Sequence, residues 1–132
     1  MFENIHWPTM ILIAFLVGIG AFIFTSRRTL RKNITFLPEA EFVDGMRKAQ
    51  LIDLRKKDEF DAGHINGSRN IPLVMLNKSV SKLRGDQPIY LVGNDEKIAR
   101  RATAILMMKN FTNIYGLQGG INAWSKPLKT KK

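Results

Sequence analysis

The longest apolar stretch of the chain lies close to its N-terminus. Residues 10–24 read MILIAFLVGIGAFIF and contain no polar side chain. As a helix, residues 7–26 would be about 30 Å long, which matches the hydrocarbon thickness of a bilayer. A helix on the surface of a soluble domain would show a polar face, and this run has none. We therefore predict one membrane-spanning helix over about residues 8–25.

Downstream of this run, short apolar segments alternate with helical spacing. Runs of four to six apolar residues between turn signals are typical of strands buried on both faces. Strands that alternate with helices indicate a largely parallel sheet, so the predicted fold class is α/β, preceded by one transmembrane helix. We expect strands at 49–54, 88–92 and 113–116, an extended passage at 70–73, and helices that begin at Pro38, cover 58–62, 74–83 and 98–106, and contain Trp124.

The charges of the chain lie almost entirely after the apolar run. Residues 27–132 hold all 21 basic and 10 of the 11 acidic residues, a net charge of +11. By the positive-inside rule, the flanking cations place the C-terminal part in the cytoplasm and a short N-terminus outside. They also favour contact with anionic lipid. A cleaved signal peptide is disfavoured, because the n-region MFENIHWP holds no Lys or Arg. The flanking cations are Arg27, Arg28, Arg31 and Lys32.

The chain contains no cysteine. Disulfides, thiolate metal sites and cysteine nucleophiles are therefore excluded together. Its two histidines, His6 and His64, lie in unrelated contexts, and no dinucleotide or phosphate-loop motif occurs, so we expect no metal and no cofactor. The positive charge alone would suit nucleic acid. Because no aromatic-basic stripe accompanies it, no nucleic-acid binding is expected.

Two segments of the chain carry recognisable motifs. Residues 51–73 contain Asp53-x-Arg55, then Glu-Phe, then Gly-His64-Ile-x-Gly-Ser and Asn-Ile-Pro. Residues 117–124 read LQGGINAW and include Gly119, Gly120 and Trp124. In this order the motifs closely resemble those of rhodanese-like domains. The resemblance spans roughly 35–125 and divides the chain into an anchor with a basic connector (1–32), a rhodanese-like domain (33–128) and a basic tail (129–132).

The resemblance implies a sulfurtransferase fold whose catalytic loop has changed. In single-domain relatives this loop reads Cys-x-x-Gly-x-Arg, and the cysteine carries sulfane sulfur as a persulfide. The corresponding residues here have Gly93 in place of the cysteine, Glu96 in place of the glycine and Ile98 in place of the arginine. We call residues 93–98 the degenerate loop; it consists of Gly93, Asn94, Asp95, Glu96, Lys97 and Ile98.

The chemistry of the degenerate loop disfavours catalysis. Glycine offers no nucleophile, and no Ser or Thr occurs from Gly93 to Ala102. Main-chain N–H groups at a helix start normally stabilise an anion. Here Asn94 or Asp95 is suited to cap the helix, and the acids Asp95 and Glu96 would repel thiosulfate or phosphate.

The retained motif residues are expected to serve the fold more than a ligand. Asp53 and Arg55 suit buried hydrogen bonds, and His64 suits an anchor for its turn. Gly119 and Gly120 permit close backbone approach, and Trp124 suits the core.

Two hypotheses for function follow. The first is a noncatalytic binding or regulatory module at the cytoplasmic face of the membrane, with an unknown protein partner. The alternative is a residual enzyme that relays sulfur using a cysteine of a partner. A phosphatase activity would lack its catalytic residues in the same way, because related phosphatases also depend on a loop cysteine and arginine.

Overall fold

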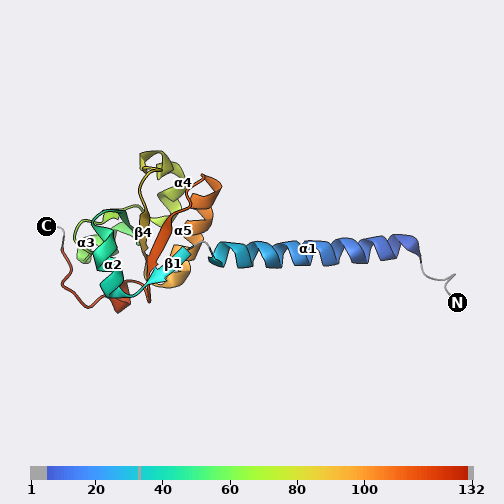
Figure 1. Ribbon diagram of the computed structural model, residues 1–132, viewed down its shortest axis with the longest axis horizontal. Helices are drawn as coiled ribbons and strands as arrows, with labels where there is room; N and C mark the ends of the chain where they lie inside the picture. Colours follow the sequence, from blue (N-terminus) through green and yellow to red (C-terminus); the bar gives the residue numbers. More distant parts are fainter. Residues whose placement is uncertain (1–5, 33, 131–132) are drawn as a thin grey trace. The chain divides into compact units, whose positions relative to one another are not determined.

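The computed structural model describes residues 6–32 and 34–130, and the chain separates into two units, 1–32 and 33–132. The first unit contains one helix, α1 (Trp7–Lys32) (Figure 1). Its section Trp7–Thr25 has a mean hydropathy of 2.2, is not buried by the protein, and is long and apolar enough to cross a membrane.

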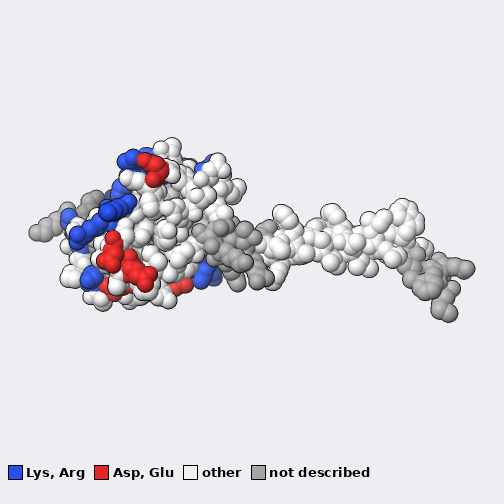
Figure 2. All heavy atoms as spheres, viewed as in Figure 1, with Lys and Arg blue, Asp and Glu red and all other residues white. Residues whose placement is uncertain are grey.

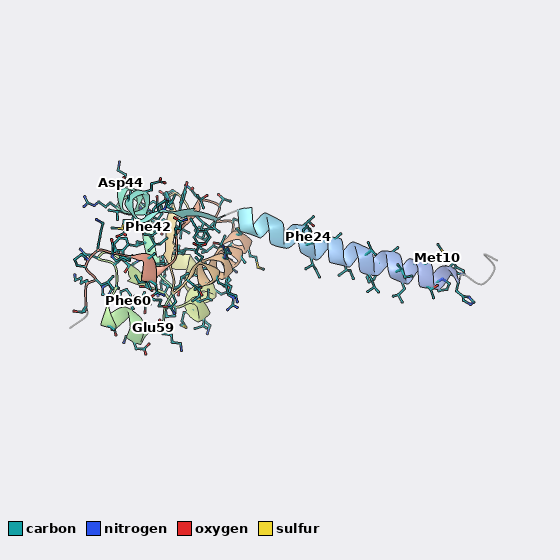
Figure 3. All side chains as sticks on the ribbon, turned by 90° about the horizontal axis from the view of Figure 1, so that it is seen from below. Met10, Phe24, Phe42, Asp44, Glu59 and Phe60 are labelled. Atoms are coloured by element: carbon teal, nitrogen blue, oxygen red, sulfur yellow. The ribbon has the colours of Figure 1, made fainter. Side chains whose placement is uncertain are left out.

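The described surface of α1 fits that reading by composition. The side chains of Met10 and Phe24 project from the helix and are 57% and 66% exposed (Figure 3). No charged residue occurs between Trp7 and Thr25, so this part is white in Figure 2. The helix continues to Lys32 through the residues expected as a connector, because no Gly or Pro interrupts it. The side chains of residues 26–33 lie outside the described set.

The second unit is built on a five-stranded parallel sheet in the order β1-β5-β4-β2-β3. The predicted strands at 49–54, 88–92 and 113–116 are confirmed as β2, β4 and β5. The sequence patterns did not reveal the edge strand β1, in which only the first of four residues is buried. The strands are β1 (Ile34–Leu37), β2 (Gln50–Asp53), β3 (Arg69–Asn70), β4 (Ile89–Val92) and β5 (Ile114–Leu117).

Helices cover both faces of this sheet. One core packs Leu91 of β4 against Leu76 and Leu106, and a second core packs Tyr90 of the same strand against Phe42. Successive residues of β4 therefore point into opposite cores, as the pleat requires, and the predicted α/β fold class is confirmed. The helices are α2 (Glu39–Met46), α3 (Lys57–Ala62), α4 (Leu76–Ser79) and α5 (Glu96–Met108).

The prediction of one helix over 74–83 is wrong. This stretch forms a 3₁₀ turn, η2 (Leu73–Met75), then the single turn α4, then a second 3₁₀ turn, η3 (Val80–Lys82). Only its Leu76 is fully buried. Its Asn and Ser residues favour local hydrogen bonds over a regular helix. The last predicted helix, expected to contain Trp124, is instead the 3₁₀ turn η4 (Ile121–Ala123), which ends just before that residue.

Candidate functional site

The carboxyl ends of the parallel strands bring the motif segments together. The degenerate loop follows β4, the Asp53–Arg55 segment closes β2, and residues 118–124 follow β5. β2 and β5 both pair with β4 in parallel, so the three connections lie together at the carboxyl ends of the strands. Ligand sites of open α/β sheets form at these ends.

Asp95 is the residue that caps α5. Its Oδ1 accepts the main-chain N–H of Ile98 at 3.2 Å, which confirms one of the two expected capping residues. Asn94 instead lies exposed, and its carbonyl oxygen accepts from Asn122 Nδ2 at 3.4 Å. Lys97 is exposed on the first turn. The carboxylate of Asp95 thus occupies one of the N–H donors that an anion would otherwise meet.

Glu96 joins the degenerate loop to the closing motif. Its Oε2 accepts the main-chain N–H of Gly119 at 2.9 Å, and its Oε1 accepts from Arg100 at 3.2 Å on the next helical turn. Both oxygens therefore have partners within the protein. The glutamate does more than repel an anion, because it links two segments that follow different strands.

Gly93 lies buried at the end of β4 with little free space around it. A Cβ atom placed on Gly93 would lie 3.0 Å from the Cβ of Ile98 and 3.2 Å from the carbonyl oxygen of Asp95. Its own carbonyl accepts the N–H of Ile121 at 2.8 Å. The Ile98 Cγ2 also lies 3.2 Å from that Cβ position, so this branched side chain fills space that a side chain at residue 93 would need.

Gly120 allows the closing motif to approach the degenerate loop. Its φ is +69°, and a Cβ there would lie 2.7 Å from the carbonyl oxygen of Asn94. Gly119 also has a positive φ, +77°, and a Cβ there would lie 2.8 Å from the Cβ of Ala123. Both positions require glycine for conformation and for space.

Asp53 and Arg55 form a buried ion pair. Asp53 is fully buried and Arg55 is 8% exposed, and Nη2 of the arginine lies 2.8 Å from Oδ2 of the aspartate. The Arg55 Nε donates to Oδ1 at 3.0 Å, and Nη2 also donates to the carbonyl of Gly63 at 2.6 Å. These contacts tie the end of β2 to the turn after α3. The Arg55 guanidinium therefore already donates hydrogen bonds to the Asp53 carboxylate and the Gly63 carbonyl.

His64 links that turn to the C-terminal segment. Its ring stacks on Phe60 at 3.8 Å, and its Nδ1 lies 2.7 Å from the Phe60 carbonyl; because a carbonyl only accepts, Nδ1 carries the proton. The main chains of His64 and Lys129 exchange two hydrogen bonds of 2.9 and 2.7 Å. The expected basic tail is therefore docked at its first residue, while residues 131–132 lie outside the described residues.

Trp124 is half-buried and contacts the second core through an edge-to-face pair with Phe42, with ring centroids 6.5 Å apart. Its Nε1 is buried without a hydrogen-bond partner among the described residues. The next residue, Ser125, donates from both its N–H and its hydroxyl to Glu39. The Ser125 hydroxyl, more than any other group, lowers the pKa of the Glu39 carboxyl below its ordinary value of 4.5.

A pocket of about 220 Å³ remains open beside the degenerate loop. Its lining is mostly apolar and combines Ile98 with residues that follow β2 and β3. Glu59 of α3 also lines the pocket, and one of its carboxylate oxygens is buried without a hydrogen-bond partner in the described part of the chain (Figure 3). Val74 at the pocket is 85% exposed.

Sequence reasoning assigned no role to Glu59 or Val74. The Glu-Phe motif contains Glu59 and could have drawn attention to it. Nothing in the sequence marks Val74, because its exposure depends on how the 73–82 stretch breaks. Among the described residues, no three His, Asp or Glu side chains group closely enough to hold a metal ion.

Comparison with known proteins identifies the fold. The family model of the rhodanese-like domain matches residues 39–127. The uncharacterised protein YqhL of Bacillus subtilis is 40% identical over 124 residues, which cover 93% of this chain and 94% of that protein. The thiosulfate sulfurtransferase GlpE of Pseudomonas aeruginosa is 30% identical over 76 residues, which cover 58% of this chain and 69% of the enzyme.

Solved structures agree with that match. The rhodanese-like domain of the Anabaena Alr3790 protein aligns with a TM-score of 0.63 at 21% identity, over 72% of this chain and 78% of the other. A rhodanese-like domain protein from Staphylococcus aureus aligns with a TM-score of 0.62 at 19% identity, over 74% and 99%. The chain therefore belongs to the rhodanese-like domain family, and it contains no cysteine.

Proposed function

We propose that this protein is a membrane-anchored, noncatalytic rhodanese-like module that binds a protein partner through the surface around the degenerate loop. The observation that carries the proposal is that a chain of the rhodanese-like family contains no cysteine; the motif resemblance assigns the nucleophile position to Gly93. A persulfide needs a thiolate on which to form, and this chain provides none. The scaffold around the missing atom is nevertheless fully built.

The apolar section of α1 supports attachment to the membrane. Residues 7–25 match a bilayer in length and composition, and the four cations that follow them support a cytoplasmic domain. A chain without cysteine allows this orientation to be tested by labelling one introduced cysteine at a time. In intact cells, a membrane-impermeant maleimide should label Glu3→Cys and spare Asp44→Cys until the cells are opened. Labelling of Asp44→Cys from outside would reverse the proposed orientation.

The pocket beside the degenerate loop supports a partner-binding role. Its apolar lining suits a side chain of another protein, and the exposed Val74 extends the apolar surface at its edge. The acids of the degenerate loop are occupied by capping and by Gly119, so a partner meets a surface that is already ordered.

Photo-crosslinking in living cells tests the position of this interface. A photo-reactive residue at Val74 should give one discrete crosslinked product. Met108 is the matched control, because it is 83% exposed, apolar and located at the far end of α5. Equal products from positions 74 and 108, or none from position 74, would contradict the proposed surface.

A sulfur-transfer assay tests the absence of catalysis. The detergent-solubilised full-length protein is incubated with thiosulfate and cyanide, with a cysteine-containing sulfurtransferase as positive control. We expect no thiocyanate above the buffer rate. Turnover by the protein alone would refute the proposal. Turnover only after addition of a thiol-bearing partner would favour the alternative of sulfur relay through a cysteine of that partner.

A further inference from the structure

A second pocket lies at the amino ends of the strands, whereas the degenerate loop lies at their carboxyl ends. It has a volume of about 280 Å³ and opens beside the amino end of β2, where Gln50 begins the strand. Three basic side chains from separate segments line it: Arg69 starts β3, Lys82 ends η3, and Arg84 lies in the loop before β4. Among the described residues that line it there is no Asp or Glu.

A buried amide holds the mouth of this pocket in place. Gln50 is 7% exposed, and its Nε2 donates to the carbonyl of Arg84 at 2.7 Å. The Arg84 N–H donates in return to Gln50 Oε1 at 2.6 Å. The loop that carries Lys82 and Arg84 is therefore tied to the central sheet. Cations held on an ordered backbone lose less conformational entropy when they bind a ligand.

Arg84 already makes two contacts of the kind that it would make with a phosphate group. Its Nε and Nη2 donate to the two carboxylate oxygens of Asp86 at 3.1 and 2.8 Å. Both side chains are more than 60% exposed, so the pair contributes little and is readily exchanged. The same two-pronged geometry suits two oxygens of a phosphate.

We propose that this pocket, lined by Arg69, Lys82 and Arg84, binds a phosphate group. Three cations without an acid in the lining favour a multiply charged anion over a carboxylate. The pocket is smaller than most sites for whole organic ligands, which suits a headgroup or a small phosphate ester.

The position of the pocket in the sheet supports a lipid headgroup as one source of the phosphate. In the strand registers, Gln50 pairs with Ile89, Ile89 with Ile114, and Ile114 with Ile34, so the strands start in one row. Three strand spacings place Gln50 about 14 Å from Ile34, the first residue of β1. This source rests on the proposed membrane attachment, whereas a soluble phosphate ester does not.

Titration with inorganic phosphate tests the pocket without a membrane or a partner. In NMR spectra of the full-length protein in non-ionic detergent, the amide chemical shifts of residues 67–69 and 82–87 should change with phosphate concentration and reach saturation. Lys82→Gln should weaken binding about fivefold, since a surface hydrogen bond to a charged group contributes on the order of 1 kcal/mol. Arg101→Gln is the matched control, because Arg101 is exposed on α5. An unsaturable response, or equal weakening by both variants, would overturn the proposal.

Removal of an acid provides a test in the opposite direction. Asp86→Asn releases the Arg84 guanidinium and should tighten phosphate binding by a few fold. Asp44→Asn removes the same charge from the exposed side of α2 and should change it less. Equal effects of the two substitutions would show that binding depends only on the net charge of the protein, and this would overturn the proposed phosphate site.

Nanodiscs separate the two sources of phosphate. Shifts at 67–69 and 82–87 that appear with phosphatidylglycerol, are absent with phosphatidylcholine alone and are reduced by Lys82→Gln would assign a lipid headgroup. Shifts that appear with soluble phosphate but not with phosphatidylglycerol would identify a small phosphate ester as the source. Either result supports the proposed phosphate site. Silence in detergent and in both nanodiscs overturns it. Detection of sulfur transfer would refute the proposed function and leave the detergent titration unaffected.

Discussion

Restoring the missing thiol is the most direct test of how the degenerate loop works. Gly93→Cys places a side chain where a Cβ atom would lie 3.0 Å from Ile98 Cβ, 3.2 Å from Ile98 Cγ2 and 3.2 Å from the Asp95 carbonyl oxygen. These separations are shorter than comfortable van der Waals contact, and the sulfur atom needs further room. The neighbours must therefore move before a cysteine fits.

The cost of that movement follows from the behaviour of packed cores. Overpacking of this kind destabilises a domain by about 1–3 kcal/mol. In a domain of roughly 100 residues each kcal/mol lowers Tm by about 4–8 °C, so Gly93→Cys should lower it by roughly 4–24 °C. Gly93→Ala is the matched control, because it adds the same Cβ without the sulfur. Ile98→Ala removes the Cγ2 contact and should recover part of the loss, a favourable coupling of about 0.5–1 kcal/mol.

Thermal unfolding of the full-length variants in detergent, followed by near-UV circular dichroism, measures the packing term. Thiocyanate production from thiosulfate and cyanide measures the chemistry. We expect Gly93→Cys to remain near the buffer rate, because Asp95 and Glu96 disfavour both a thiolate and an anionic substrate. Gly93→Cys combined with Glu96→Gly and Ile98→Arg should give the higher rate, since it removes an acid and adds a cation.

Two results would refute this reasoning. If Gly93→Cys unfolded at the wild-type temperature, the crowding around Ile98 would be unimportant. If the single substitution supported sulfur transfer as fast as the triple variant, the acids of the degenerate loop would not control its chemistry.

Three other substitutions test separate contacts. Glu96→Ala removes the acceptor for Gly119 and should cost about 1 kcal/mol, measured by chemical denaturation, whereas Glu96→Gln should cost less because it keeps an oxygen there. Gly120→Ala should cost at least about 2 kcal/mol in the same assay, because φ is +69° and the added Cβ meets main-chain atoms. The Ser125 contacts lower the pKa of Glu39 below 4.5, so they add stability above that pH and lose it as pH falls. The stability difference between wild type and Glu39→Gln should therefore shrink below pH 4.5, and a constant difference from pH 6 to 3 would contradict this.

The match between pattern and element depended on the length of the pattern. The helix from Ile98 to Leu106 repeats its apolar positions over several turns, and α5 covers it fully. The stretch 74–83 offered a weaker repeat and broke into three short turns. Strand β1 is as short as β2 and β4, but those two are buried at all four positions, whereas β1 shows neither a continuous buried run nor a strict alternation.

The candidate site was only partly readable in the same way. The motif resemblance singled out Gly93, Glu96 and Ile98, whereas the sequence left Asn94 and Asp95 as alternative caps and the structure assigned the role to Asp95. The bond from Glu96 to Gly119 joins residues 23 positions apart, and no local pattern predicts it. The phosphate pocket likewise draws on three separate segments.

What the sequence determined by itself is chemical and local: no thiolate can form in a chain without cysteine, residues 7–25 are apolar enough to enter a membrane, and the motifs follow the strands of an α/β domain. Only the tertiary structure decided which groups meet. It filled the space beside Gly93 with Ile98, gave the acid of Glu96 a partner in Gly119, and docked Lys129 on the turn of His64. The physical reason is that composition and spacing act along the chain, whereas contacts between distant segments depend on how the strands are ordered in the sheet.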